Sequence, residues 1–294
     1  MPDSNDTPRF PMPKGACDCH FHILGPKDIY PPKAGTVFLM PDALPSNHAA
    51  MRARTGLERM VLVQHGGYYG HNQPMLDVLA AEGDIARGVA TFDPEIADEE
   101  IAQLNDAGVR GMRIHSARDM SKLEEVWGQI SSLAKRFVSH GWHIQLLLSG
   151  HMRDALLPRL ADLPVPVVID HLGLFRPDRI EGHEGFAAFL KLLECEHIWV
   201  KVSGADRVTR NGAFEDALPV MRELINTAPD RMVWGTDWPH TSERPPHKKG
   251  DPPIVVPYGD VDENRCLAVL ADACPDAETF NNILTHNPAR LYGF

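Results

Sequence analysis

The sequence Asp18-Cys19-His20-Phe21-His22, close to the N-terminus, has the pattern of a buried β-strand with polar residues on one face. Alternate side chains of a strand point to the same face. Asp18, His20 and His22 therefore share one face, and Cys19 and Phe21 share the other. Two imidazoles side by side can bind a metal, polarise a carbonyl group or transfer a proton. This strand alone leaves open whether its histidines have a chemical or only a structural role.

Seven further short apolar segments follow, and stretches with helical periodicity or a helix-capping residue separate most of them. The predicted strands after the first are 59–64, 86–91, 111–114, 143–148, 165–170, 198–202 and 232–236. The expected helices are 46–54, 72–81, 98–106, 123–139, 151–160, 182–193, 214–228, 262–273 and 277–284. Short apolar strands that alternate with amphipathic helices indicate a parallel sheet covered by helices.

Eight such units in about 250 residues predict an α/β protein with the (β/α)8 TIM barrel fold. We expect a single barrel domain over residues 1–294, with additional C-terminal helices. A doubly wound open sheet is the alternative, but no Gly-x-Gly-x-x-Gly follows the first strand. Residues 1–14 are polar and rich in proline, which predicts a flexible arm rather than a secretory signal. Such an arm could pack against a neighbouring subunit in a homo-oligomer.

The composition narrows the classes of partner. A hydrophobic fraction of 43% is enough for a sizeable core, and no apolar run approaches the length of a membrane span. The net charge of -11 argues against binding to nucleic acid or to acidic membranes. The five cysteines are scattered and form no Cys-x-x-Cys motif, which is typical of a reduced protein of the cytoplasm. A small anionic ligand remains compatible, because a few arginines can reverse the field inside a pocket.

Polar residues gather at the C-terminal ends of the predicted strands, where TIM barrels place their active sites. His20 and His22 end the first strand. The other strand ends and the loops directly after them supply His65, Arg113, Arg118, His171, Arg207, Asp237 and His240. Groups that are distant in sequence thus converge on one rim, whereas structural residues would prefer the apolar layers below. We expect these side chains to form one site.

Three of these strand ends resemble the amidohydrolase superfamily. They are His20-Phe-His22, the histidine of Val-Ile-Asp-His171-Leu-Gly, and Gly-Thr-Asp237-Trp-Pro-His240. Within the superfamily the chain most resembles the 2-pyrone-4,6-dicarboxylate lactonase branch, over nearly its whole length. The resemblance implies that Asp237 activates the hydrolytic water by accepting its proton. It also implies that the three histidines polarise a lactone carbonyl, or hold a cation that does so.

Two departures bear on the metal. The metal-rich branches of the superfamily carry lysine or glutamate at the end of strand four, where this chain has Arg113. They also place a histidine at the end of strand five, whereas His143 here opens that strand. We therefore expect no bridged pair of metal ions. One divalent ion such as zinc could still bind to His20, His22, His171 and Asp237. The lactonase branch is associated with turnover without a tightly bound metal, so both alternatives stay open.

The arginines point to the substrate. Arg113 and Arg118 match two arginines that dicarboxylate lactonases keep for substrate carboxylates, and Arg207 matches a third. A guanidinium group pairs with a carboxylate through two parallel hydrogen bonds. His65 and His240 lie at the expected rim and could also contact the substrate. The branch has a tyrosine near Leu147 and a serine near Gly66, so the particular substrate stays open.

These observations predict an enzyme that hydrolyses the ring ester of an acidic lactone. The candidate substrates are 2-pyrone-4,6-dicarboxylate, a muconolactone that could be sulfonated, and a sugar-acid lactone, in the catabolism of aromatic or sugar-acid compounds. A lactone isomerase or a zinc-dependent decarboxylase of the same superfamily is the second interpretation. A non-catalytic protein that binds an acidic metabolite is the third. The missing strand-five histidine weighs against the decarboxylase, and the full rim of acid–base groups weighs against a binding protein.

Overall fold

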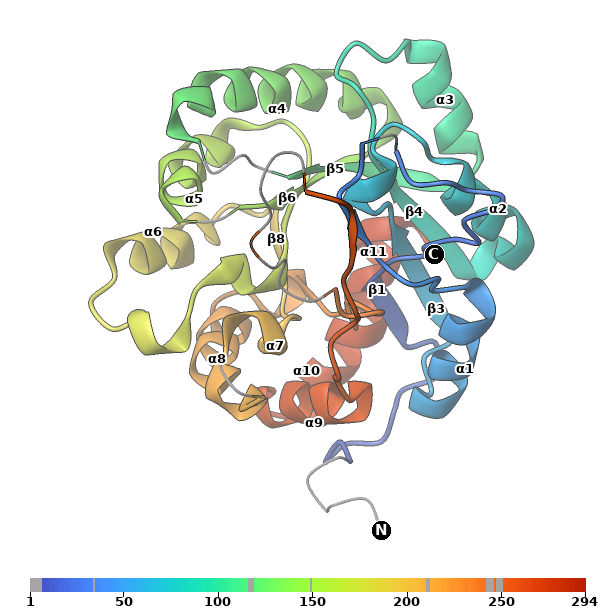
Figure 1. The fold of residues 1–294 in the computed structure, drawn as a ribbon. Helices are drawn as coiled ribbons and strands as arrows, with labels where there is room; N and C mark the ends of the chain where they lie inside the picture. Colours follow the sequence, from blue (N-terminus) through green and yellow to red (C-terminus); the bar gives the residue numbers. More distant parts are fainter. Residues whose placement is uncertain are drawn as a thin grey trace.

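Eight parallel strands form the centre of the fold (Figure 1). The computed structural model describes residues 7–33, 35–115, 119–148, 150–209, 212–241, 246 and 251–294. The strands of the sheet, each paired with the next, are β1 (Cys17–Phe21), β3 (Arg59–Val63), β4 (Ala86–Ala90), β5 (Val109–His115), β6 (His143–Leu147), β7 (Val167–Ile169), β8 (Ile198–Lys201) and β9 (Met232–Val233). Consecutive pairing in sequence order is the arrangement expected for a barrel rather than for a doubly wound sheet.

The segment after β9 runs along β1 and brings the two ends of the sheet together. The amide of Cys19 donates to the carbonyl of Trp234 at 2.9 Å, and the amide of Asp237 donates to the carbonyl of His20 at 2.7 Å. The amide of His22 donates to the carbonyl of Trp238 at 2.8 Å. The sheet is thus a nearly closed barrel, and the predicted (β/α)8 fold is confirmed. The same contacts place the histidine strand beside Asp237.

Helices surround the barrel (Figure 1). They are α1 (Pro45–Thr55), α2 (Gln73–Glu82), α3 (Asp98–Asp106), α4 (Leu123–Phe137), α5 (Gly150–Leu156), α6 (Glu184–Leu192), α7 (Ala205–Val208), α8 (Leu218–Thr227), α9 (Glu263–Ala273), α10 (Ala277–Asn281) and α11 (Asn287–Tyr292). On α4, Val126, Ile130, Leu133 and Phe137 recur at helical spacing, and all four are buried. Burial of this apolar face holds the helix against the sheet.

Some helix boundaries differ from the prediction for a local reason. The predicted helix 214–228 begins as a 3-10 turn, and α8 itself begins at Leu218, with Pro219 in its first turn. The predicted helix 151–160 ends at Leu156 and continues as a 3-10 turn that contains Pro158. Proline lacks an amide hydrogen and fits only the first turn of an α-helix, so each proline sets a boundary.

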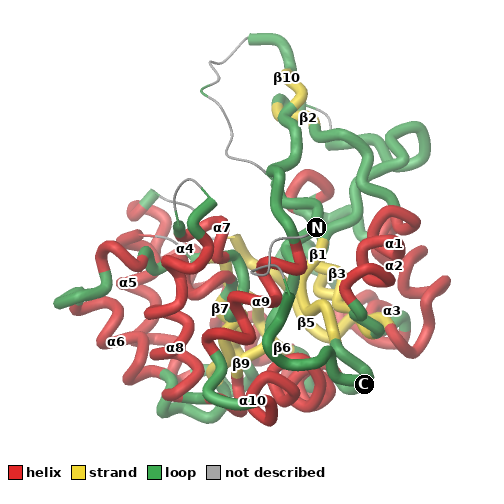
Figure 2. The backbone as a smooth tube through the Cα atoms, turned by 90° about the horizontal axis from the view of Figure 1, so that it is seen from below, coloured by secondary structure: helices red, strands yellow, loops and turns green. Residues whose placement is uncertain are grey.

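Two long proline-rich connections pair with each other above the barrel. β2 (Phe38–Leu39) and β10 (Ile254–Val255) form a parallel two-stranded sheet. The amide of Ile254 donates to the carbonyl of Val37 at 2.9 Å. Figure 2 shows this small sheet standing off one end of the barrel. The sequence predicted only loops here, because strands of two residues carry no periodic pattern.

The segment that precedes the barrel contacts the C-terminal helices of the same chain, although its sequence favoured a loose arm. Arg9 donates through Nε to the carbonyl of Ala271 at 3.0 Å. The ring of Phe10 lies 5.7 Å from that of Phe280, measured between centroids. Among the described residues, no helix combines the length and the apolar character needed to cross a membrane.

Candidate active site

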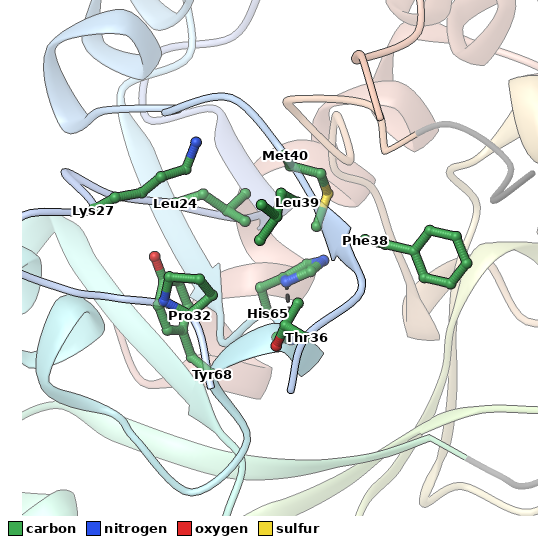
Figure 3. Close-up of a pocket in the computed structure, with 10 residues that line it drawn as sticks. Leu24, Lys27, Pro32, Thr36, Phe38, Leu39, Met40, His65 and Tyr68 are labelled. Carbon is green, nitrogen blue, oxygen red and sulfur yellow. Dashed lines mark hydrogen bonds between the residues drawn. The ribbon is translucent and has the colours of Figure 1, made fainter. Parts of the chain in front are cut away.

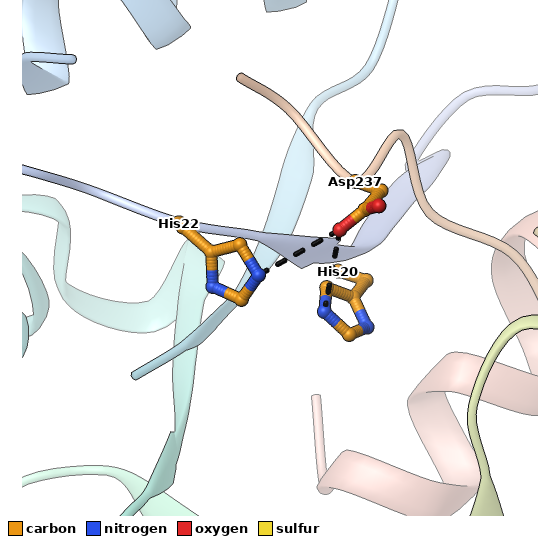
Figure 4. Close-up of side chains that lie close together, drawn as sticks. All are labelled: His20, His22 and Asp237. Atoms are coloured by element: carbon orange, nitrogen blue, oxygen red, sulfur yellow. Dashed lines mark ion pairs between the residues drawn. The ribbon is translucent and has the colours of Figure 1, made fainter. Parts of the chain in front are cut away.

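The four residues predicted to carry the chemistry lie together at one end of the barrel. His20 is on β1, His22 directly follows it, His171 follows β7 and Asp237 follows β9. Oδ1 of Asp237 lies 3.7 Å from Nε2 of His20, 3.6 Å from Nε2 of His22 and 3.8 Å from Nε2 of His171. None of the four residues is more than 2% exposed. Figure 4 shows His20 and His22 turned toward the carboxylate of Asp237.

A carboxylate below the histidines fixes this geometry. Asp18 accepts hydrogen bonds from the amide and the hydroxyl of Thr236, at 2.9 and 2.7 Å, and from the amide of His20, at 3.1 Å. Gly235 permits the close approach of the two strands, since a Cβ atom there would lie 2.3 Å from the amide nitrogen of His20. Asp237 itself has a φ of 61°, in the left-handed region. The close contact between β1 and the segment after β9, which we call the seam of the barrel, therefore fixes the positions of His20 and Asp237.

The hydrogen bonds of His22 define its tautomer. Nδ1 of His22 lies 2.7 Å from the carbonyl oxygen of Val63, which can only accept. Nδ1 therefore carries the proton, and Nε2 presents a lone pair toward Asp237. Nδ1 of His171 is 3.2 Å from the hydroxyl of Ser203, which can donate or accept. Burial lowers the pKa of His171 to about 3, so its imidazole is neutral near pH 7.

Arg207 holds the opposite oxygen of Asp237. Its Nε and Nη2 atoms both contact Oδ2 of Asp237, and Nη2 also donates to the hydroxyl of Thr241 at 3.2 Å. Burial alone would raise the pKa of Asp237, but the Arg207 charge and the smaller effects of the three neighbouring histidines together outweigh burial, and the pKa lies well below the usual range. Asp237 is therefore ionised. Its Oδ1 has no hydrogen-bond partner among the described residues.

A second buried layer lies next to this cluster. Asp170 accepts through Oδ2 from Nε of Arg113 at 2.9 Å and from the side-chain amide of Gln145 at 3.1 Å. Burial opposes ionisation of Asp170, but the charge of Arg113 and the smaller effects of His20 and Lys201 together outweigh burial, and the pKa of Asp170 lies well below the usual range. Nδ1 of His20 is 3.4 Å from Oδ1 of Asp170. Arg113 is thus engaged by a carboxylate of its own chain.

Lys201, at the end of β8, is a buried charged residue beside the cluster that the sequence reasoning missed. It is fully buried, and its Nζ lies 3.7 Å from Oδ1 of Asp170. Burial lowers the pKa of Lys201 to about 8, and the same burial lowers the pKa of His20 well below its usual value. A signal was present, because a charge ends the otherwise apolar run Ile198-Trp-Val-Lys201. Lysine is almost never fully buried without a partner.

The other residues predicted to contact the substrate lie outside the cluster around Asp237 or outside the described residues. His65 lines a small pocket with Phe38 and Leu39 (Figure 3), and its ring centroid is 5.3 Å from that of His22. His240 is buried, and its Nε2 lies 3.2 Å from Oε1 of Glu263 on α9. Its hydrogen bond is therefore directed to a helix outside the cluster. Arg118 lies outside the described residues.

Two tyrosines that follow β3, Tyr68 and Tyr69, and His143 on β6 have structural partners. The hydroxyl of Tyr68 donates to the carbonyl of Tyr30 at 3.1 Å, and that of Tyr69 donates to the carbonyl of Phe92 at 2.9 Å. His143 opens β6, as predicted, and its ring packs 5.4 Å from that of Tyr292. None of these contacts reaches Asp237.

The cluster has donors suited to a metal ion. Ligand atoms of His20, His22 and Asp237 lie within 4.8 Å of one another, and a second such group joins His20 with Asp170 and His171. Within the described part of the chain, Nε2 of His20, Nε2 of His171 and Oδ1 of Asp237 are buried without a hydrogen-bond partner. Tetrahedral zinc with bonds of about 2.0–2.1 Å separates its ligands by about 3.4 Å, close to the separations from Oδ1 of Asp237. The residues fit a candidate His/Asp metal site.

The arrangement of the site is typical of one class of hydrolases. Two histidines lie at the end of β1, one histidine follows β7, and an aspartate follows β9. The family model described as Amidohydrolase matches residues 17–294, and the chain belongs to this family. It is 34% identical to a 2-pyrone-4,6-dicarboxylate hydrolase of Comamonas testosteroni over 97% of this chain and 92% of that protein. It is 28% identical to a 4-sulfomuconolactone hydrolase of Hydrogenophaga intermedia, over 97% and 91%.

Solved structures agree with these sequence relatives. A putative 2-pyrone-4,6-dicarboxylic acid hydrolase from Pseudomonas putida superposes with a TM-score of 0.78 at 26% identity. The match covers 96% of this chain and 98% of that one. The resemblance to amidohydrolases inferred from the strand-end motifs is confirmed.

Proposed function

We propose that this chain is a lactonase that hydrolyses the ring ester of a carboxylated lactone. The observation that carries the proposal is the asymmetric environment of Asp237. Arg207 holds Oδ2, while Oδ1 accepts no hydrogen bond from the described residues and faces three imidazole nitrogens. A water molecule beside Oδ1 would have an ionised carboxylate to accept its proton and several groups around it to orient it.

In the proposed reaction, Asp237 accepts a proton from water as the water oxygen attacks the lactone carbonyl; the ring C–O bond then breaks, and the proton passes from Asp237 to the leaving ring oxygen. The Arg207 charge favours the ionised form of Asp237, but it also makes Asp237 a weak base. The carbonyl must therefore be activated, so that the attacking water becomes more acidic as its bond to carbon forms. Groups that stabilise the developing oxyanion supply this activation. The histidines of the cluster are the groups in place to do so.

We further propose that the cluster can bind one zinc ion. His20, His22, His171 and Asp237 would hold it. When bound, it would supply Lewis-acid polarisation of the carbonyl and a lower pKa for water. The buried, unpartnered nitrogen and oxygen atoms of this set support a cation. The buried positive charges of Arg113 and Lys201 nearby oppose a cation. The histidines of the chain must therefore also contribute to the activation of the lactone carbonyl.

We propose that the substrate carries negative charge and that arginines bind it. Arg113 and Arg207 are 11% and 26% exposed, and each has several N–H donors, of which the buried aspartates use only part. We propose that Arg118, His65 and His240 also contact the substrate. The names of two relatives, a dicarboxylate hydrolase and a sulfomuconolactone hydrolase, specify anionic ring esters. Catabolism of aromatic compounds is the setting in which such lactones arise.

The setting in the cell is also a proposal. All five cysteines are free thiols, which favours a reducing compartment such as the cytoplasm. The net charge of -11 argues against nucleic acid and acidic membranes as partners, and we propose a small anionic lactone as the ligand. Assembly into a homo-oligomer is compatible with the barrel.

A lactone panel tests the proposed function. The purified protein, assayed with its native metal content, after chelation and after zinc addition, would be given 2-pyrone-4,6-dicarboxylate, muconolactones, 4-sulfomuconolactone and sugar-acid lactones. Ring opening releases acid, so uptake of base at constant pH measures turnover. Turnover on at least one carboxylated or sulfonated lactone is expected. No ring opening on any of them, or a product that remains cyclic, would overturn the proposal.

A further inference from the structure

Lys201 lies inside the barrel directly beneath the histidine cluster. Its side chain is fully buried, yet among the described residues no carboxylate accepts a hydrogen bond from it, since Oδ1 of Asp170 is 3.7 Å away. A buried ammonium group is retained only where its donors are satisfied. The groups that accept hydrogen bonds from the Lys201 ammonium therefore determine its role.

Three acceptors surround Nζ of Lys201. They are the carbonyl oxygen of Cys19 at 2.8 Å, Oε1 of Gln145 at 2.8 Å and Nδ1 of His20 at 3.2 Å. An ammonium group has three donors and no lone pair. The orientation of Gln145 agrees, because its amide nitrogen donates to Asp170 and its oxygen is left for Lys201. Nδ1 of His20 must therefore accept, and the proton of this imidazole must reside on Nε2.

The competing arrangement is less well supported. Nδ1 of His20 is also 3.4 Å from Oδ1 of Asp170, and a hydrogen bond there would need the proton on Nδ1. That distance is longer than the one to Lys201, and although Oδ1 of Asp170 is left without a hydrogen-bond partner in the described ranges, the Lys201 ammonium charge lies 3.7 Å from it. A proton on Nδ1 would also leave one N–H of the buried ammonium without an acceptor.

We propose that Lys201 is a positioning residue that holds His20 in the Nε2–H tautomer. His20 then points an N–H donor into the site, while the neighbouring His22 points a lone pair, because its own Nδ1 proton is bound to Val63. One imidazole can stabilise a developing oxyanion, and the other can accept a proton or bind a cation. A metal ligand needs a lone pair, so His20 must first move its proton from Nε2 to Nδ1 before it can help to hold the proposed zinc ion, and Lys201 opposes that move.

Nuclear magnetic resonance of the metal-stripped protein tests the tautomer directly. Long-range correlations between ring protons and 15N in histidine-labelled protein near neutral pH distinguish the two tautomers, and His20→Gln assigns the signals. In the unmodified chain His20 is expected as Nε2–H. In Lys201→Met, which removes the donor at similar volume, the proton is expected on Nδ1, toward Asp170. A His20 protonated on Nδ1 in the unmodified chain would overturn the proposal, whether or not the variant folds.

Zinc affinity supplies a second readout. Calorimetry against a competing chelator should show Lys201→Met binding zinc at least tenfold more tightly than the unmodified chain, because Nε2 of His20 gains a lone pair and a positive charge is removed. Lys135→Met, at an exposed position of α4, is the control for loss of one charge and should match the unmodified chain. Equal zinc affinity in Lys201→Met and Lys135→Met would contradict the proposed role of Lys201.

The kinetic consequence rests on the proposed lactone hydrolysis. In the metal-free enzyme Lys201→Met should lower kcat more than it raises KM, because the N–H donor of His20 acts on the transition state. A protein without lactonase activity that keeps the Nε2–H tautomer would refute only the proposed function. An active protein whose His20 has the other tautomer would refute only the role of Lys201.

Discussion

Arg207 binds one oxygen of Asp237 and thereby leaves the other to the imidazoles. The two contacts from Arg207 both go to Oδ2, and Oδ1 stands 3.6–3.8 Å from three Nε2 atoms. The arginine thus sets both the charge and the direction of the carboxylate. In the proposed reaction, Arg207 would therefore orient the base, in addition to any contact with the substrate.

Replacement of this arginine should change the pH dependence of turnover. In Arg207→Gln the charge that lowers the pKa of Asp237 is lost, while the burial that raises it remains. The acid limb of the kcat/KM profile should therefore move to higher pH. At neutral pH, loss of charged hydrogen bonds worth about 1.5–3 kcal/mol should lower kcat/KM by roughly 10- to 100-fold. Arg222→Gln, at an exposed position, is the control, and an unmoved acid limb in Arg207→Gln would contradict this account.

Removal of the charge on Asp237 should abolish most of the activity. Asp237→Asn keeps the shape of the side chain but cannot accept a proton from water. Turnover should fall by about 10²- to 10⁴-fold, the usual contribution of a general base. Steady-state kinetics on the best lactone of the panel, with circular dichroism to verify folding, measure the effect. Asp216→Asn, on the surface, should retain activity; if Asp237→Asn did so too, Asp237 would not be the base.

A pair of glycine substitutions should have opposite effects on stability. In Gly235→Ala the new Cβ would meet the backbone nitrogen of His20 at 2.3 Å, so the seam must open. We expect a loss of several kcal/mol in the free energy of unfolding, of the order caused by overpacking or more. Gly128 lies within α4, and a Cβ atom there would meet no described residue of another element within 4 Å. Gly128→Ala should therefore add about 0.5–1 kcal/mol.

Urea denaturation measures both glycine variants. The test fails if Gly235→Ala unfolds at the same urea concentration as the unmodified chain. It also fails if Gly128→Ala, the matched substitution, destabilises the protein as much as Gly235→Ala does.

His143 should make the protein less stable in acid. Burial, with a smaller contribution from the Lys201 charge, lowers the pKa of His143 to about 3, against about 6.5 in an unfolded chain. Between these values the unfolded chain binds a proton that the folded chain does not. The free energy of unfolding therefore falls as the pH falls below about 6.5, by up to about 1.4 kcal/mol per pH unit. Above that range this contribution is constant.

The variant His143→Leu should show a shallower slope of unfolding free energy against pH in that window. The slope should not vanish, because burial lowers the pKa of His171 as well. Tyr292→Phe is the control, since it alters the ring beside His143 without removing a group that titrates there. An unchanged slope in His143→Leu, measured by urea denaturation at several pH values, would refute the assignment.

Much of the barrel could be predicted because its signals are local. Most of the strands are short, largely apolar runs, and α4 has a regular apolar face. The convergence of His20, His171 and Asp237 then followed from the rule that barrel sites lie at strand ends. The boundaries near Pro158 and Pro219 were less predictable, because a proline can sit inside the first turn of one helix or end another.

What could not be predicted depends on contacts between distant segments. Pairing of β2 with β10 joins residues more than 200 positions apart through two residues on each side. The charge of Lys201 is explained only once Cys19 and Gln145 are known to surround it. The roles expected for Arg113 and Arg207 remain proposals, but their engagement with buried aspartates was visible only in three dimensions.

The small sheet above the barrel has a consequence for how substrate range can change. Phe38 and Leu39 belong both to β2 and to the lining of the pocket that contains His65. Their position depends on β10, which arrives from the far end of the chain. A longer or shorter connection would therefore reshape the wall of this pocket while every barrel strand keeps its register. If the proposed function is right, insertions and deletions in these two connections would alter which lactones fit, without any change in the cluster around Asp237.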